Sequence, residues 1–161
     1  MSIYEKLPLA LWRMMKFPRL LYKLGFHHFM GHMVLLLTTV GRKSGLKRVT
    51  PLQYEEIDGS YCVASARGPK ADWYRNILAN PDVEVQIRSN RFHAIAEPTT
   101  DPSCIADFLQ IRLQRHPILV GNMLRSEGLP KSPDRAQLER FAEKSAMVVI
   151  RPIKGETPAL T

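Results

Sequence analysis

Short apolar runs separated by turn signals dominate the middle of the chain, and they predict β-strands. The run over residues 33–40 ends in β-branched residues, which is typical of a buried strand. Residues 49–55 predict a second strand, and Asp58-Gly59 is a hairpin turn signal that leads into a third strand over residues 61–65. These three strands are expected to form an antiparallel meander.

Strict alternation of apolar and polar positions over residues 83–87 predicts a further strand with one buried side. Ser89-Asn90 then turns the chain into a strand over residues 91–97, and a last apolar strand is expected over residues 146–150. Six short strands, mostly in hairpins, favour an α+β fold whose antiparallel sheet curls into a barrel, because closure removes the exposed edges.

Helical patterns interrupt and follow the strands. Asp72 is expected to cap a helix that ends at residues 80–81, where Asn-Pro stops it. The helical period over residues 101–116 and a helix that opens at residues 132–133 are typical of peripheral helices that cover a sheet.

The N-terminal residues combine an apolar stripe with basic side chains. Residues 3–16 place apolar positions at helical spacing and predict an amphipathic helix. We therefore expect a helical segment over residues 1–30, a cofactor-binding barrel domain over residues 31–153 and a tail over residues 154–161. The simpler interpretation is that the segment packs on its own domain, as a lid or a cover. The alternative is peripheral contact with an anionic membrane surface.

Composition favours one folded, cytoplasmic domain. The chain has 161 residues, 45% of them apolar, which is enough for a full core without disulfide staples. The two cysteines, Cys62 and Cys104, suit a reducing compartment, and Cys62 is expected to be a small core residue. Charges and prolines interrupt the first apolar residues before a signal peptide could form, and the longest apolar run, residues 33–37, is too short to cross a bilayer.

Charge is concentrated at one end of the chain. The net charge is +8, and residues 1–50 hold nine basic residues and one acidic residue. Because the rest is balanced, the first third is expected to meet an anionic partner: a phosphorylated ligand, a membrane surface or nucleic acid. Nucleic acid is disfavoured, because aromatic residues do not alternate with the basic run at residues 41–48 as a stacking platform requires.

The loop between the first two strands carries the clearest chemical signal. Gly41 and Gly45 flank an Arg-Lys-Ser run, so backbone N–H groups and the cations of Arg42 and Lys43 can converge on one phosphate. Arg48 returns from the next strand as a second anchor. The spacing matches neither a Walker loop nor a dinucleotide fingerprint. The alternative interpretation is a solvated basic hairpin.

Three motifs, in order, resemble those of one protein family. They read Thr39-Val-Gly-Arg-Lys-Ser-Gly-x-x-Arg-x-x-Pro51-Leu, Asp58-Gly-x-Tyr-x-Val-Ala-Ser65 and Trp73-Tyr-x-Asn-x-x-Ala-Asn-Pro81-x-Val-x-Val85. Over residues 34–97 the chain resembles the deazaflavin-dependent nitroreductases, also called coenzyme F420H2-dependent quinone reductases. The resemblance implies an antiparallel split β-barrel of the FMN-binding type that holds a deazaflavin.

The resemblance also implies roles for residues in these motifs. The cofactor's phosphate and acidic tail would be held by polar side chains of the loop, namely Arg42, Lys43, Ser44, Lys47 and Arg48. Pro51 would shape the groove. Ala64 and Ser65 would approach the ring, which Trp73 would wall. The chain departs from the family pattern at two places: the segment between Ser65 and Trp73 is short, and residues 101–145 contain no tyrosine. The family's substrate contacts are therefore not assigned to residues of this chain.

Other polar residues carry weaker signals. Tyr54 and Tyr74 are candidate catalytic donors or ring walls, although a tyrosine in such a place is more often a core residue with a solvated hydroxyl. The histidines at positions 27, 28 and 32 lack a neighbouring acid or cysteine, so we expect no metal site. The carboxylates within residues 55–58 are expected at a solvated hairpin tip.

These observations predict an oxidoreductase that uses a reduced deazaflavin to transfer a hydride to a quinone, nitroaromatic or similar acceptor. NADH and NADPH alone are expected to be poor donors, because the chain has no dinucleotide fingerprint. The alternatives are an FMN-dependent enzyme on the same barrel and a non-enzymatic binding protein. The physiological acceptor and the oligomeric state stay open, with a homodimer among the options.

Overall fold

A six-stranded barrel, a helix at one end and a layer of helices on one side make up the described part of the chain. The computed structural model describes residues 34–65 and 67–155. The strands and helices, in chain order, are β1 (Val34–Val40), β2 (Lys47–Ile57), β3 (Ser60–Ser65), α4 (Asp72–Ala79), β4 (Asp82–Ile87), β5 (Asn90–Thr99), α5 (Pro102–Arg115), α6 (Pro117–Ser126), α7 (Arg135–Ala142) and β6 (Ala146–Pro152). A short 3₁₀ turn, Gly68–Lys70, precedes α4.

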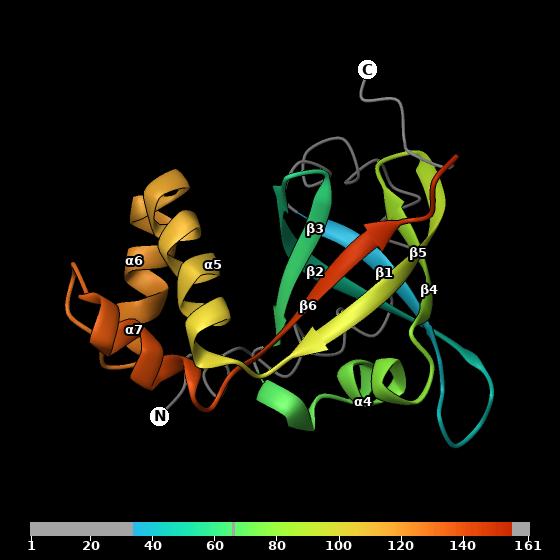
Figure 1. The fold of residues 1–161 in the computed structure, drawn as a ribbon, viewed down its shortest axis with the longest axis horizontal. Helices are drawn as coiled ribbons and strands as arrows, with labels where there is room; N and C mark the ends of the chain where they lie inside the picture. The colour runs from blue at the N-terminus through green and yellow to red at the C-terminus, as the bar shows by residue number, and fades with distance from the viewer. Residues whose placement is uncertain (1–33, 66, 156–161) are drawn as a thin grey trace, which may run out of the picture.

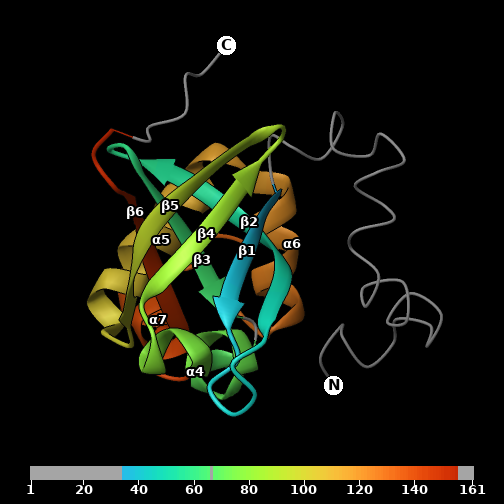
Figure 2. The ribbon, with the colours of Figure 1, turned by 90° about the vertical axis from the view of Figure 1, so that its right-hand side faces the viewer.

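The strands close into an antiparallel barrel in the order β1-β2-β3-β6-β5-β4, which confirms the predicted fold class (Figures 1 and 2). β1 completes the closure, because Leu37 lies opposite Thr50 of β2 on one side and opposite Val85 of β4 on the other. β6, the last strand, pairs with both β3 and β5. Every strand therefore has two hydrogen-bonded neighbours, and the barrel exposes no edge.

Two-residue turns join two of the hairpins. Asp58 and Gly59, at φ 50° and 74°, connect β2 to β3 as predicted, and both angles suit the primed turns that match strand twist. The β4–β5 turn is one residue earlier than expected. Ile87 pairs with Asn90, so the turn consists of Arg88 and Ser89, and Arg88 takes the left-handed conformation at φ 54°. The prediction at residues 89–90 was wrong because an arginine gives no turn signal.

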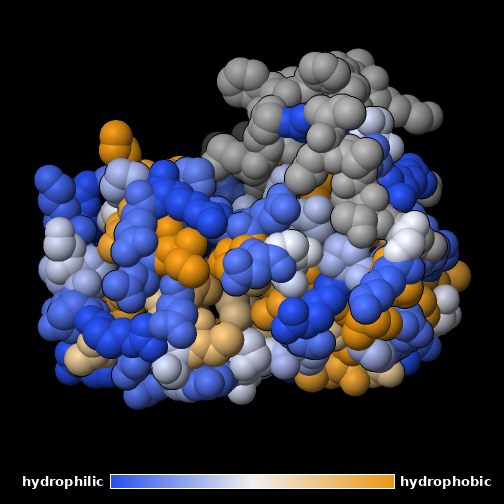
Figure 3. All heavy atoms as spheres, turned by 45° about the horizontal axis from the view of Figure 1, so that its top comes forward, coloured by the Kyte–Doolittle hydropathy of each residue, from blue (hydrophilic) through white to orange (hydrophobic). Residues whose placement is uncertain are grey.

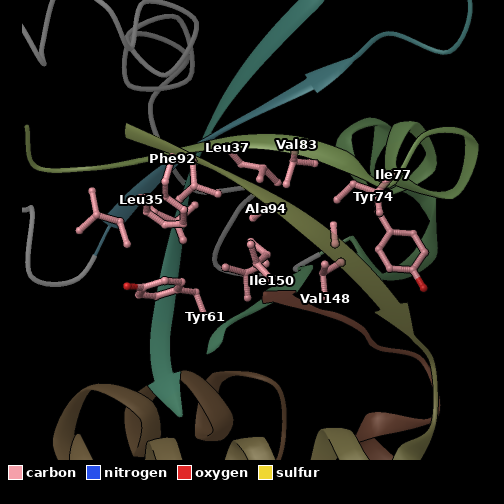
Figure 4. Close-up of a cluster of buried hydrophobic side chains, with 14 of the residues drawn as sticks. Leu35, Leu37, Tyr61, Tyr74, Ile77, Val83, Phe92, Ala94, Val148 and Ile150 are labelled. Carbon is pink, nitrogen blue, oxygen red and sulfur yellow. The ribbon is translucent and has the colours of Figure 1, made fainter. Parts of the chain in front are cut away.

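Alternation along the strands fills the barrel with apolar side chains. In β4, Val83, Val85 and Ile87 are buried while the two residues between them are partly exposed. Leu35, Leu37, Val63, Phe92, Ala94, Val148 and Ile150 join them inside the barrel, and Tyr74 and Ile77 of α4 close one end (Figure 4). The interior is a packed core rather than a channel.

Helices α5, α6 and α7 form a second layer against the outer face of β3 and β6 (Figure 1). This layer has its own core, in which Phe108 and Leu109 of α5 meet Leu124 of α6 and Leu138 of α7. β3 and β6 are consequently buried on both faces. α5 confirms the helix predicted over residues 101–116, and the Asp101 side chain caps it by accepting from Ser103 N.

Two helix assignments need correction. The second helix of the layer, α6, was not predicted. Pro117 begins this helix, although the same proline was predicted to end the preceding helix. α7 begins at Arg135, and its cap is Asp134, whose carboxylate accepts from Gln137 N while the Gln137 side chain accepts from Asp134 N. The Ser132-Pro133 pair lies before the helix and not in its first turn.

Several predictions fall outside the described ranges. The helix over residues 1–30 and the histidines at positions 27, 28 and 32 are among them, and the tail over residues 154–161 is described only to residue 155. The division into these segments therefore stays a prediction. Among residues 34–65 and 67–155, no helix is long and apolar enough to span a bilayer, and no group of three or more metal-ligating side chains gathers.

Candidate functional site

The loop between β1 and β2 is a compact turn with two backbone hydrogen bonds. Gly41 N donates to Leu46 O at 2.8 Å, and Gly45 N donates to Gly41 O at 2.7 Å. Gly45 has φ +68°, and a Cβ at Gly41 would lie 2.7 Å from Ser44 Oγ, so the fold of the loop depends on both glycines. Ser44 Oγ also accepts from Leu46 N at 3.3 Å. The Arg-Lys-Ser run is thus held in one conformation at the end of the barrel.

The loop presents cations to solvent. Lys43 and Arg48 are exposed, and neither forms an ion pair with another residue of the described ranges. Lys47 lies 3.9 Å from Glu84, with its side chain 74% exposed. An exposed pair at that separation contributes little, so Lys47 can turn to another anion at small cost. These side chains provide charge for a phosphate or carboxylate partner.

Arg42 makes contacts of a different kind, because its side chain points back to α4. Its guanidinium donates to Asn76 Oδ1 at 3.1 Å and to Asp72 Oδ1 at 3.1 Å, and its backbone N–H also donates to Asn76 Oδ1, at 3.2 Å. The hydrogen bond from Arg42 lowers the pKa of Asp72 below its usual value. In Figure 2 the loop and α4 lie side by side at the lower end of the barrel.

This contact corrects the expected role of Asp72. The residue before α4, Ala71, occupies the cap position and offers no side-chain cap, while Asp72 is the first helical residue and pairs with Arg42. A carboxylate in the first turn still suits the helix dipole. Sequence spacing could not separate the two roles, since both place an acid at the start of a helix.

Asn76, at the end of the barrel where the β1–β2 loop meets α4, was not predicted from the sequence to be a functional residue. It is buried, and its Nδ2 donates to Thr39 Oγ1 at 3.2 Å while its Oδ1 accepts the two bonds from Arg42. The carboxamide therefore joins β1, the loop and α4. The available signal was an asparagine in the middle of a helix, where this side chain is unfavourable unless it has a partner elsewhere.

The residues predicted near a cofactor ring lie on both faces of the barrel wall. Pro51 of β2 and Ala64 of β3 are partly buried on the outer face, where Ala64 packs against the helical layer. Ser65 faces the other way and is buried, and its Oγ donates to Gly68 O at 2.7 Å. Trp73 is half-buried at the first turn of α4, with its ring 6.1 Å from that of Tyr74 in an edge contact.

The two candidate catalytic tyrosines lie on the barrel-interior side. Tyr74 is buried in the barrel core, and burial raises its pKa. Tyr54 is half-buried beside the same core, with its ring 5.6 Å from that of Tyr61 in an edge contact. The geometry favours the core interpretation for both, and a catalytic role for either stays a prediction.

A second polar cluster joins β2 to the helical layer. Glu55 is buried and not at a solvated hairpin tip as expected, because three cationic or imidazole side chains surround it. Its carboxylate accepts from Arg112 Nε at 3.3 Å and from Arg115 at 3.2 Å, and it lies 3.1 Å from His116 Nε2. The prediction was wrong because these partners come from α5 and its C-terminus, 57 or more residues along the chain.

Comparison with known proteins places these features in a family. The sequence model of the family described as F420H(2)-dependent quinone reductase matches residues 22–117, more than half of the chain. An F420H(2)-dependent quinone reductase of Mycobacterium tuberculosis (strain H37Rv) is 39% identical over 67 residues, which cover 40% of this chain and 45% of that protein. A second protein of this strain, named for the same activity, is 45% identical over 60 residues, 35% of this chain and 50% of its own. The chain thus spans about half the length of the curated relatives it matches.

Solved structures agree on the fold alone. HutZ, the heme storage protein of Vibrio cholerae, superposes with a TM-score of 0.53 at 16% identity, over 81% of this chain and 87% of that chain. The protein Rv2991 of Mycobacterium tuberculosis superposes with a TM-score of 0.51 at 15% identity, over 85% of this chain and 89% of that chain.

Proposed function

The chain belongs to the F420H(2)-dependent quinone reductase family, and on that premise we propose that it reduces a quinone with a hydride from a reduced deazaflavin. The family match over residues 22–117 carries the proposal. Nitroaromatic and similar conjugated acceptors belong to the same proposal, as does a cytoplasmic location.

The residues at the loop fit the anionic tail of such a cofactor. Lys43 and Arg48 have no anionic partner among the described residues, and Lys47 has only a long, exposed one. Cations of this kind beside a rigid turn suit phosphate and carboxylate groups. Arg42 already bonds to Asp72 and Asn76, so in this proposal it holds the loop in place and Lys43 and Arg48 contact the tail.

The protein's part in the reaction is to bind, orient and exclude water. The bound deazaflavin supplies the hydride chemistry, as organic cofactors generally do. From the loop, the outer face of β2 leads through the partly buried Pro51 towards Ala64 on β3, which packs against the helical layer. Figure 3 shows the surface hollowed between the helical layer and the barrel, with apolar side chains visible in the hollow. We propose that the ring and the acceptor stack there.

Titration of the purified protein with deazaflavin and with FMN, followed by cofactor fluorescence, tests the proposal. The deazaflavin should bind more tightly, because its longer anionic tail can contact more of the loop than one phosphate can. Lys43→Ala and Arg48→Ala should each weaken deazaflavin binding about tenfold, in line with the strength of charge-assisted hydrogen bonds. Lys131→Ala is the matched control, because it removes an exposed lysine from the segment between α6 and α7.

Tighter FMN binding would support the alternative of an FMN-dependent enzyme on the same barrel. With reduced deazaflavin supplied, addition of menadione or a nitroaromatic should speed its oxidation. Efficient NADPH oxidation without any flavin would contradict the proposal. Light scattering of the same sample would decide between a monomer and the homodimer, and sedimentation with anionic vesicles would test membrane contact through residues 1–30.

A further inference from the structure

The polar cluster on the outer face of β2 ends in an exposed amide that the reaction described above does not use. Arg112 of α5 is 6% exposed and bonds to Glu55, which is also 6% exposed. A second nitrogen of the same guanidinium donates to Gln53 Oε1 at 3.1 Å. Three side chains thus form a line from the buried carboxylate to the exposed Gln53.

This line fixes which way the Gln53 amide points. An arginine can only donate hydrogen bonds, so the amide oxygen of Gln53 must face Arg112 and its Nε2 must face away. Nε2 has no hydrogen-bond partner among the described residues. Gln53 therefore presents an oriented, exposed N–H donor, and Glu55 keeps the supporting guanidinium in place.

The strand register puts that donor beside the residues expected near the ring. Tyr54 and Val63 form the last pair of the β2–β3 ladder, and Gln53 and Ala64 are the next residues of the two strands, both on the outer face of the wall. Pro51 is on the same face two residues earlier, because side chains alternate along a strand. The donor thus lies at the end of the proposed ring site away from the phosphate loop.

We infer that the Gln53 amide, positioned by Arg112, binds the oxygen atom of the acceptor on which negative charge develops. The inference rests on the proposed function. The quinone gains a hydride from the reduced deazaflavin and a proton from water, the proton that the deazaflavin loses passes to water, and the product leaves as the hydroquinone. The incoming electron pair puts negative charge on a quinone oxygen until that oxygen takes a proton from water. An N–H donor aimed at this oxygen binds the transition state more strongly than the neutral quinone.

Substitution of Gln53 by methionine tests this, because Gln53→Met keeps the length of the side chain and removes the donor. We expect kcat/KM for menadione to fall about tenfold, the size expected for one hydrogen bond to a charged group, while deazaflavin affinity and Tm stay at wild-type values. Arg112→Lys should lower kcat/KM in the same direction, since a lysine cannot bond to both Gln53 and Glu55 as the fork does. Gln110→Met, on the exposed side of α5, is the matched control and should match wild type.

A binding measurement without turnover separates this inference from the proposed function. 4-Nitrophenol resembles an acceptor with charge on oxygen, and its absorbance reports ionisation. Bound to wild type, it should ionise at lower pH than when bound to Gln53→Met, because the amide N–H favours the phenolate. Equal ionisation in both proteins, or a loss of deazaflavin affinity in Gln53→Met, would overturn the inference. If the wild type binds no deazaflavin at all, the proposed function fails, and the nitrophenol result still decides the role of Gln53.

Discussion

Replacement of Asn76 by alanine should be the most damaging single change at the loop end of the barrel. Asn76→Ala removes three hydrogen bonds, two accepted from Arg42 and one donated to Thr39. At roughly 1 kcal/mol for each bond, with an added cost for the buried Thr39 hydroxyl left unpaired, the free energy of unfolding should fall by about 2–4 kcal/mol. Domains of this size have a total stability of about 5–15 kcal/mol, so the loss is readily measured.

Urea denaturation followed by tryptophan fluorescence provides the assay, because Trp73 lies in the same helix. Asn80→Ala is the matched control: its Oδ1 accepts one exposed bond, from Asp82 N at 3.0 Å, so it should cost no more than about 1 kcal/mol. Asn76→Ala should also weaken deazaflavin binding, since Lys43 would lose its fixed loop. An Asn76→Ala protein as stable as Asn80→Ala would refute the assignment of Asn76 as the residue that joins β1, the loop and α4.

Three further predictions concern the core, the loop ion pair and a turn. Leu37→Ala, at a fully buried position, should lower the free energy of unfolding by about 2–5 kcal/mol, whereas Leu46→Ala, 60% exposed, should change it little; urea midpoints compare them. The folded-state pKa of Asp72 is lowered, so the Asp72 carboxylate should stabilise the protein relative to Asp72→Asn above about pH 4. This difference in stability should vanish as the pH falls through the lowered pKa, and unfolding midpoints measured between acid and neutral pH would show it. Gly68→Ala should be more destabilising than Gly59→Ala, because both glycines have positive φ but only at Gly68 would the added Cβ lie 2.6 Å from a backbone carbonyl oxygen; thermal unfolding would rank them.

The periodicity of apolar residues was enough to predict the barrel. Alternation in β4 and the Asp58-Gly59 turn are local signals, and the structure confirms the strands they indicate. The boundaries that failed depend on weak local preferences, such as the left-handed Arg88. α6 was missed because Pro117 serves as the start of one helix while it also marks the end of another.

The polar contacts could not be predicted, because their partners are distant in the chain. Arg42 was predicted to bind a phosphate, and its bonds to Asp72 and Asn76 of α4, 30 or more residues later in the chain, carry no local sequence signal. Glu55 reads as a solvated carboxylate until α5 supplies Arg112. Residue type and spacing report the charge of a site, whereas the tertiary fold decides which charges remain available for a ligand.

The place of β6 in the barrel has a consequence for how the chain acquires its structure during synthesis. β6 pairs with β3 and with β5, and it lies about 80 residues beyond the end of β3. Until residues 146–152 have left the ribosome, β3 and β5 therefore expose unpaired backbone edges, and the core of the helical layer lacks Met147 and Val149 of β6. Such contacts between distant segments form slowly, and exposed edges promote aggregation. The nascent protein should therefore depend on chaperones most strongly in the interval between synthesis of β5 and synthesis of β6.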